Sequence, residues 1–125
     1  MVRLTTINPA TEEVIKTYNS EKVSSIPKFI EKSKKAFSYW SSLNVKERCN
    51  YLKKISKLLL KNKNYYARLI TTEMGKPITE SIAEIEKCSW ACNYYVENGE
   101  KFLQDELIKT EYKKSYIKFQ PLGII

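Results

Sequence analysis

The amino-acid sequence predicts a mainly α-helical fold with short β-strands near its two ends. Apolar residues recur at intervals of three and four over most of residues 25–103, which is the spacing of one face of an α-helix. From residue 111 the pattern changes to strict alternation, which is typical of a strand with one face in water. With 125 residues, the chain has the length of one domain and can bury a core.

The N-terminal segment is predicted to form two extended pieces joined by a turn. Asn8 and Pro9 both favour turns and lie between the two pieces. The second piece, residues 14–18, consists mostly of the β-branched and aromatic residues that are frequent in strands. We therefore expect a β-hairpin over residues 1–20.

Two helices are predicted next. The first covers about residues 25–41 and carries Pro27 in its first turn, where proline is well tolerated. The second begins at Asn44, because Asn44 and Glu47 have the spacing of a capping box, in which two side chains satisfy free backbone N–H groups. Apolar residues follow a helical period along one side of the second helix and leave its lysines in water: Val45, Cys49, Leu52, Ile55 and Leu59.

A helix corner is predicted at residues 69–77, where a short helix over about residues 64–74 ends and a longer one begins. Gly75 can adopt the left-handed conformation that ends a helix at little steric cost. Lys76 brings a positive charge to the negative end of the helix, and the fixed φ of Pro77 suits the first turn of the next helix.

The longest helix follows this corner and has a seam of apolar and small residues spaced four and three apart. Its members are Ile78, Ile82, Ile85, Ser89, Cys92, Val96, Gly99 and Leu103. Such a seam suits packing against another helix, and its small residues permit a close approach. Trp90 and Tyr94 lie on a different side, so we expect both sides of this helix to be covered.

The last fifteen residues, 111–125, are predicted to be a strand that leads toward a further part of the fold. Pro121 cannot donate a backbone hydrogen bond, so it belongs at an edge or bend. Residues 122–125 begin an apolar run that resembles a buried parallel strand, and the chain stops there. We predict one continuous unit: the hairpin at 1–20, a helical layer over 25–110 and this strand.

The charge balance raises the question of nucleic acid. Lysine and arginine outnumber acidic residues by 22 to 14, which gives a net charge of +8. Only Arg3, Arg48 and Arg68 are arginine, the residue preferred for reading phosphate and guanine, and the lysines of residues 48–63 fit solvated helix faces. Nucleic acid is therefore the less favoured partner, and a basic helical nucleic-acid-binding protein is kept as an alternative.

Several observations favour a cytoplasmic protein without a membrane segment. The longest aliphatic run, residues 58–60, is far too short to cross a bilayer, and the N-terminus lacks the apolar stretch of a signal peptide. An odd number of cysteines, three, argues against a disulfide framework. The lack of histidine removes a usual ligand of zinc.

No complete active site can be assembled from the residue pattern. Cys88 and Cys92 have helical i, i+4 spacing that could serve metal or redox chemistry, but structural burial accounts for them better. Cys49 lies in an apolar stripe, and no histidine exists to activate it. A paired-carboxylate acid/base site is the other candidate near the corner, although the helix dipole already favours acidic residues there: Glu73, Glu80, Glu84 and Glu86.

With the elements in order, the chain resembles the N-terminal part of an aldehyde dehydrogenase. The motifs that carry this resemblance are Ile7–Thr11 with Glu13–Ile15, Ala36–Trp40, Val45–Arg48, Leu69–Pro77 and Ser115–Ile125. They extend over essentially all 125 residues. Four stretches are most similar to the succinate-semialdehyde dehydrogenase branch: Glu73–Pro77, Ser81–Glu84, Trp90–Ala91 and Lys114–Ser115.

The resemblance implies the helical N-terminal layer of an aldehyde dehydrogenase-like α/β fold whose sheet core is largely absent here. In that family a cysteine thiolate attacks the aldehyde, hydride passes to NAD or NADP, and a glutamate-activated water releases the acid. The groups that do this match positions beyond Ile125, so no catalytic, cofactor-binding or metal residue is assigned, and NAD(P) is not expected to bind this chain alone.

The resemblance also leads to expectations about partners. We expect an N-terminal fragment that is inactive alone and that associates with itself, or with a complementary aldehyde dehydrogenase chain, through exposed apolar helix faces. A split enzyme, with a second polypeptide supplying the catalytic part, is the alternative.

Overall fold

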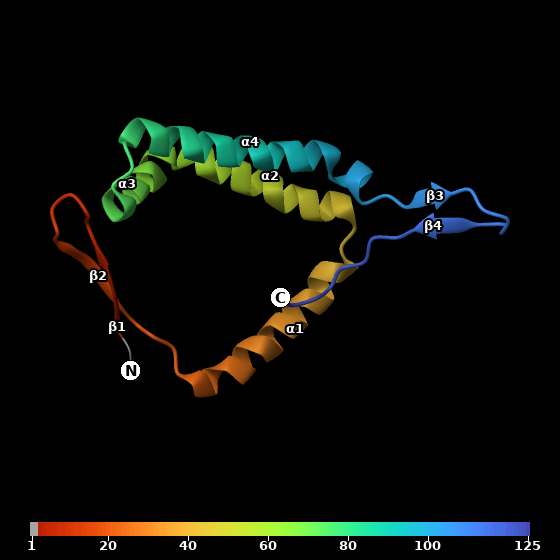
Figure 1. Cartoon of the computed structure of the whole chain (residues 1–125), viewed down its shortest axis with the longest axis horizontal. Helices are drawn as coiled ribbons and strands as arrows, with labels where there is room; N and C mark the ends of the chain where they lie inside the picture. The colour runs from red at the N-terminus through yellow and green to blue at the C-terminus, as the bar shows by residue number, and fades with distance from the viewer. Residues whose placement is uncertain (1–2) are drawn as a thin grey trace.

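A computed structural model describes residues 3–125 of the chain, and most of these residues are helical (Figure 1). The elements in chain order are β1 (Arg3–Ile7), β2 (Val14–Asn19), the 3-10 helix η1 (Val23–Ser25), α1 (Ile26–Ser42), α2 (Val45–Lys61), α3 (Lys63–Met74), α4 (Ile78–Phe102), β3 (Glu106–Ile108) and β4 (Ser115–Ile117). This confirms the predicted fold class, mainly α with short β-strands. None of the helices within residues 3–125 is long and apolar enough to cross a membrane.

Strands β1 and β2 form the predicted N-terminal hairpin. They pair antiparallel, with Leu4 opposite Tyr18. The Asn8 side chain shapes the turn, because its Oδ1 accepts a hydrogen bond of 2.9 Å from the backbone N–H of Ala10. The predicted hairpin starts at residue 1, and residues 1 and 2 lie outside the described residues.

The core consists of α2 and α4 lying side by side, with α3 packed against one end of α4 (Figure 1). The closest approach is made by small residues: Ser56 and Ser89 are both buried, and their Oγ atoms are 2.8 Å apart. The predicted seam of α4 is confirmed at its centre, where Ile85 and Ser89 are buried. On α2 the prediction is wrong at Ile55, which is 45% exposed, because the neighbouring Ser56 faces α4 instead.

The corner between α3 and α4 has the predicted glycine stop. Gly75 ends α3 with a φ of 72°, and its N–H donates to the carbonyl oxygen of Thr71 at 2.9 Å. Pro77 differs from the prediction, because it is the N-cap residue before α4 and not part of the first helical turn. Its ψ of 137° turns the chain into the new helix direction.

The C-terminal part differs most from the prediction. α4 ends at Phe102, so the helical layer is shorter than the predicted 25–110, and β3 and β4 form a second antiparallel hairpin with Leu107 opposite Tyr116. The strand predicted from residue 111 is confined to β4, because residues 110–115 form a turn. The Thr110 hydroxyl lies 2.6 Å from the Ser115 hydroxyl and accepts a hydrogen bond of 3.3 Å from the backbone N–H of Tyr112.

The apolar run at residues 122–125 is not a strand in this structure. These residues have no regular secondary structure, and Leu122 is 93% exposed. A buried parallel strand needs neighbours on both edges and helices on both faces. Within residues 3–125 the only ladders are β1–β2 and β3–β4, so the run finds no strand to pair with.

Candidate functional site

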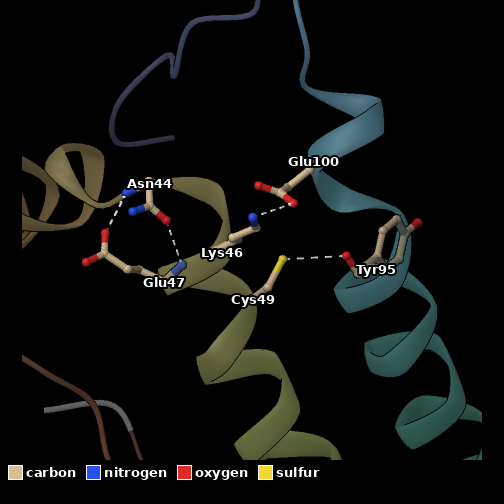
Figure 2. Close-up of polar contacts among 6 residues, drawn as sticks. All are labelled: Asn44, Lys46, Glu47, Cys49, Tyr95 and Glu100. Atoms are coloured by element: carbon tan, nitrogen blue, oxygen red, sulfur yellow. Dashed lines mark hydrogen bonds and ion pairs between the residues drawn. The ribbon is translucent and has the colours of Figure 1, made fainter.

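The three cysteines are free and lie in different environments. Cys49 is buried, and its thiol donates to the Tyr95 carbonyl oxygen at 3.7 Å across the α2–α4 contact (Figure 2). Cys92 is half-buried in the seam, as predicted, whereas Cys88 is exposed, so the prediction of burial is wrong for Cys88. Cys88 precedes the buried Ser89 by one position, which turns it away from the seam. No group of three or more potential metal ligands is formed among residues 3–125.

The carboxylates near the corner act as ion-pair partners. Glu84 pairs with Lys76, and Glu86 pairs with Lys63 at 2.6 Å. The hydrogen bond that Lys76 donates to Glu84 raises the pKa of Lys76, against a smaller opposing effect of desolvation. The Lys76–Glu84 pair links the corner to α4, and the Lys63–Glu86 pair links α3 to α4. The structure therefore uses two of the four candidate carboxylates to hold these elements together, and Glu80 lies in the first turn of α4, as the helix dipole favours.

A groove of about 360 Å³ lies where the end of α1, the start of α2 and the end of α4 meet. Its lining is mostly apolar and consists of Trp40, Val45, Arg48, Cys49, Leu52, Tyr95, Gly99, Phe102 and Leu103. The Trp40 ring packs edge-on against Tyr51 at 5.2 Å, which fixes the end of α1 beside α2. At Gly99, a Cβ atom would come within 3.2 Å of the Cys49 sulfur, a tight contact, so the glycine gives α2 and α4 room for their close approach.

Paired polar groups fix the start of α2 beside this groove (Figure 2). Asn44 and Glu47 form the predicted capping box: the backbone N–H of Glu47 donates to Asn44 Oδ1 at 2.9 Å, and the backbone N–H of Asn44 donates to Glu47 Oε2 at 2.8 Å. Lys46 Nζ lies 3.6 Å from Glu100 Oε2 and links α2 to the end of α4. The groups drawn in Figure 2 therefore already have partners within the chain.

Arg48 is the functional candidate that sequence reasoning missed. Its Nε atom is buried and has no hydrogen-bond partner among residues 3–125. Leaving a buried donor unsatisfied costs about 1–3 kcal/mol. A signal was present in the sequence, because Arg48 lies three residues after Val45 and four before Leu52, which places a charged residue within the apolar stripe of α2. The sequence analysis assigned the lysines of residues 48–63 to solvated helix faces and gave Arg48 no role of its own.

A second apolar surface follows the other side of α4, as the sequence predicts. Trp90 stacks on Tyr94 with ring centroids 5.8 Å apart, and Phe102 lies 5.9 Å from Tyr94. Trp90 is 64% exposed, so the described chain leaves this side uncovered. Phe102 also lines the groove, and the two apolar surfaces are therefore continuous.

The chain exposes far more surface than a compact protein of its size. A compact chain of 14.7 kDa exposes about 6,900 Å², whereas this one exposes 10798 Å². The excess of about 3,900 Å² on this one chain is larger than the roughly 1,000–2,500 Å² that each partner buries in a typical permanent interface. Every element contributes exposed large apolar side chains to it, including Leu4, Val14, Val23, Phe29, Leu58, Leu69, Trp90, Leu107 and Ile117.

The sequence pattern of the aldehyde dehydrogenase family matches residues 2–125, which is nearly the whole chain. The chain belongs to the aldehyde dehydrogenase family. This confirms the resemblance that the helix corner and the capping-box region suggested. The match begins before the first hairpin strand and continues past β4, so all the elements described above fall within it.

Named relatives come from the succinate-semialdehyde dehydrogenase branch of the aldehyde dehydrogenases. The chain is 33% identical over 122 residues to a probable NADP-dependent succinate-semialdehyde dehydrogenase of Synechocystis sp. and covers 27% of it. It is also 33% identical over 119 residues to the NAD(P)-dependent succinate semialdehyde dehydrogenase Sad of Escherichia coli, covering 26% of that protein. The chain thus spans about a quarter of the length of the curated relatives it matches.

Solved aldehyde dehydrogenase structures contain the same arrangement of elements. The succinic semialdehyde dehydrogenase of Streptococcus pyogenes, in complex with NADP+, superposes with a TM-score of 0.83 at 26% identity, over 90% of this chain and 25% of that one. The structure of Gox0499 superposes with a TM-score of 0.92 over 98% of this chain and 27% of that one. Its identity of 24% supports the shared fold alone.

Proposed function

We propose that this chain supplies the N-terminal helical layer of an enzyme that oxidises succinate semialdehyde to succinate with NAD or NADP. The observation that carries the proposal is the uninterrupted likeness to the Synechocystis enzyme, at 33% identity over 98% of this chain. The layer consists of the α2–α4 pair with α3. Catalysis requires the rest of the family's fold, and no residue of this chain is given a catalytic role.

The uncovered surface supports this assignment. An excess of about 3,900 Å² over a compact chain is too large for a weak, transient contact. The exposed apolar side chains lie on both hairpins and all four helices. A single flat partner surface would cover only some of these elements, whereas the remainder of a fold can surround them. We therefore propose that residues 1–125 dock as one unit onto the rest of the fold. The cytoplasmic location remains a prediction from the sequence.

Reconstitution of activity tests the proposal. The purified chain is mixed with a polypeptide that comprises the Synechocystis relative without its matched N-terminal quarter, and reduction of NADP is followed with succinate semialdehyde as substrate. We expect activity from the mixture and none from either part. The matched N-terminal segment of the relative, added to the same polypeptide, is the positive control. An assembled mixture that oxidises other aldehydes but not succinate semialdehyde would contradict the substrate assignment.

A further inference from the structure

We propose that one side of α2 binds the phosphate backbone of a nucleic acid without regard to base sequence. The binding surface is a lysine row that consists of Lys53, Lys57 and Lys61. This side of α2 is separate from the side that carries the buried Cys49 and Ser56 and packs against α4. The inference goes beyond the proposed function and does not rest on it.

The lysine row follows α2 at intervals of four residues. Four residues of an α-helix are slightly more than one turn and rise about 6 Å, so the row spans about 12 Å. Lys46 lies seven residues, or two turns, before Lys53 and extends the same side. All four lysines are exposed. Positive charges therefore line one side of a long helix over several turns.

No carboxylate of the described chain neutralises the lysine row. Among residues 3–125, lysine forms ion pairs only at Lys46, Lys63 and Lys76. The one acidic residue of α2, Glu47, is held in the capping box. Like charges four residues apart destabilise a helix, whereas a glutamate between them would stabilise it. Solvation explains why these lysines are exposed, and an anionic partner also explains why they are aligned without a counter-charge.

The net positive charge of the whole chain lies in the segment that contains α1 and α2. Residues 22–63 contain twelve basic and two acidic residues, which gives +10, whereas the other residues, ten basic and twelve acidic, give −2. A surface lined by charge of one sign attracts oppositely charged partners over a longer range than mixed charges do. α1 carries further exposed lysines at helical spacing: Lys28, Lys32 and Lys35. The charge of this segment therefore favours a polyanion as the partner.

The composition of the row favours phosphate over carboxylate. The row contains lysine and no arginine, and lysine binds phosphate as a point charge, whereas arginine suits planar pairing with carboxylates. Binding to a nucleic-acid backbone needs charge more than exact geometry, because much of its free energy comes from released counterions. A membrane-surface helix also inserts its apolar face, but the buried side of α2 already packs against α4. Nucleic acid is thus favoured over an acidic protein or an anionic membrane.

The test measures binding of the chain to labelled single strands of DNA and RNA by fluorescence anisotropy at several salt concentrations. The row variant combines Lys53→Gln, Lys57→Gln and Lys61→Gln. It should bind at least about tenfold more weakly at low salt, and the slope of log K against log salt should fall by about 2, because three phosphate contacts are lost. Two strands of unrelated sequence should bind the wild-type chain alike. Binding that is absent, or that does not depend on salt, overturns the inference.

A matched control removes the same number of charges elsewhere. Lys109→Gln, Lys113→Gln and Lys114→Gln neutralise three exposed lysines in and beside the β3–β4 turn, so both triple variants have a net charge of +5. The control should bind nearly as the wild type does. An equal loss in both triple variants overturns the inference, because net charge and not the row would then determine binding.

Folding is checked by urea unfolding, and a single charge reversal guards against a misfolded triple variant. Lys57→Glu places a carboxylate four residues from Lys53 and from Lys61, which should leave α2 as stable as before or more stable. It should nevertheless bind nucleic acid more weakly than Lys113→Glu, the control reversal in the β3–β4 turn. A stable Lys57→Glu variant that binds like Lys113→Glu overturns the inference.

Competing polyanions distinguish the occupant, and reconstitution separates this inference from the proposed function. Polyglutamate and vesicles of phosphatidylcholine with phosphatidylserine should bind more weakly than a nucleic acid of equal charge, and tighter binding to either overturns the inference. The row variant should still restore activity with the matched polypeptide of the Synechocystis relative. If the wild-type chain restores no activity but binds nucleic acid through the row, the proposed function fails alone. If it restores activity and binds no nucleic acid, this inference fails alone.

Discussion

At the residue scale, the left-handed backbone conformation of Gly75 ends α3 and forms the corner before α4. Its φ of 72° is left-handed, and an added Cβ would lie 3.0 Å from Pro9 Cγ in the N-terminal hairpin. Gly75→Ala should therefore destabilise the chain by about 1–2 kcal/mol, measured by urea unfolding followed by circular dichroism.

A second variant at Gly75 separates the two causes. Gly75→Asn carries the same Cβ atom, but asparagine tolerates the left-handed conformation. It should therefore be more stable than Gly75→Ala. Equal losses for both variants would show that contact with Pro9, and not the backbone angle, determines the cost.

Lys76 gives a pH-dependent prediction at the same corner. Its hydrogen bond to Glu84 raises its pKa above the ordinary value of 10.5. A lysine with a raised pKa contributes stability below its unfolded pKa and loses this contribution as the pH rises through its folded pKa. Glu84→Gln should lower the pKa of Lys76 and reduce stability at neutral pH, with the difference disappearing in strongly alkaline solution.

The pKa change at Lys76 can be measured by NMR titration of the lysine side-chain carbons. Glu97→Gln is the matched control, because Glu97 is an exposed carboxylate on the same helix and is not among the groups that shift Lys76. The side chains of Lys76 and Glu84 are partly exposed, so the stability effect should be small. An unchanged titration of Lys76 in Glu84→Gln would contradict the assigned cause.

Sequence reasoning was accurate where the signal is local. Asn44 with Glu47 and the glycine at 75 are stop and start signals that act through neighbouring backbone atoms, and the structure confirms them. It was wrong at Ile55, because the outcome there depends on which face of α2 meets α4. Hydropathy favoured Ile55 for this contact, whereas the small residue Ser56 forms it.

At the scale of elements, the contact between α2 and α4 depends on the pair Ser56 and Ser89. The two hydroxyls are buried and 2.8 Å apart, and Ser89 Oγ also donates to the Ser56 carbonyl oxygen at 3.2 Å. Ser89→Ala should cost about 1–3 kcal/mol, because the buried Ser56 hydroxyl loses its partner. Ser56→Ala should cost less, because the Ser89 hydroxyl can still donate to the carbonyl oxygen of residue 56. The double variant should cost less than the sum of the two, since no unpaired hydroxyl remains.

A double-mutant cycle, measured by urea unfolding, tests the serine pair. Strict additivity would show that the hydroxyls do not interact in solution. Ser89→Val serves as a size probe, because it adds bulk where the helices are closest and should cost about 1–3 kcal/mol through overpacking. An equally stable Ser89→Val variant would mean that α2 and α4 are less closely packed than the structure indicates.

The elements that the sequence predicted poorly either find no partner among the described residues or are very short. The helices follow from their own periodicity and caps. The run at residues 122–125 has the composition of a buried parallel strand, but a strand needs neighbours, and here it stays exposed. Likewise β3 is only three residues long, which is too short for alternation to reveal.

At the scale of the whole molecule, the arrangement in Figure 1 is open. The first hairpin, α1 and the second hairpin extend away from the α2–α4 pair. Among the residues described, the buried apolar side chains are only Cys49, Ala67 and Ile85. Such a core is small for 125 residues, because hydrophobic stabilisation scales with buried apolar area. The sequence predicts that both sides of α4 are covered by other parts of the fold. The structure shows exposed apolar side chains on the other elements too, so the same expectation extends to most of the chain.

This openness leads to a measurable prediction for the isolated chain. A compact chain of this length has a radius of gyration of about 14 Å. If the elements keep the arrangement of Figure 1, small-angle scattering should give a clearly larger value, and an anilinonaphthalene sulfonate dye should bind the exposed apolar side chains. Addition of the Synechocystis relative without its matched N-terminal quarter should remove most of the dye signal, because assembly covers the same side chains. A radius near 14 Å without dye binding would show that the chain buries its own apolar faces, and the helical-layer proposal would then lose its physical basis.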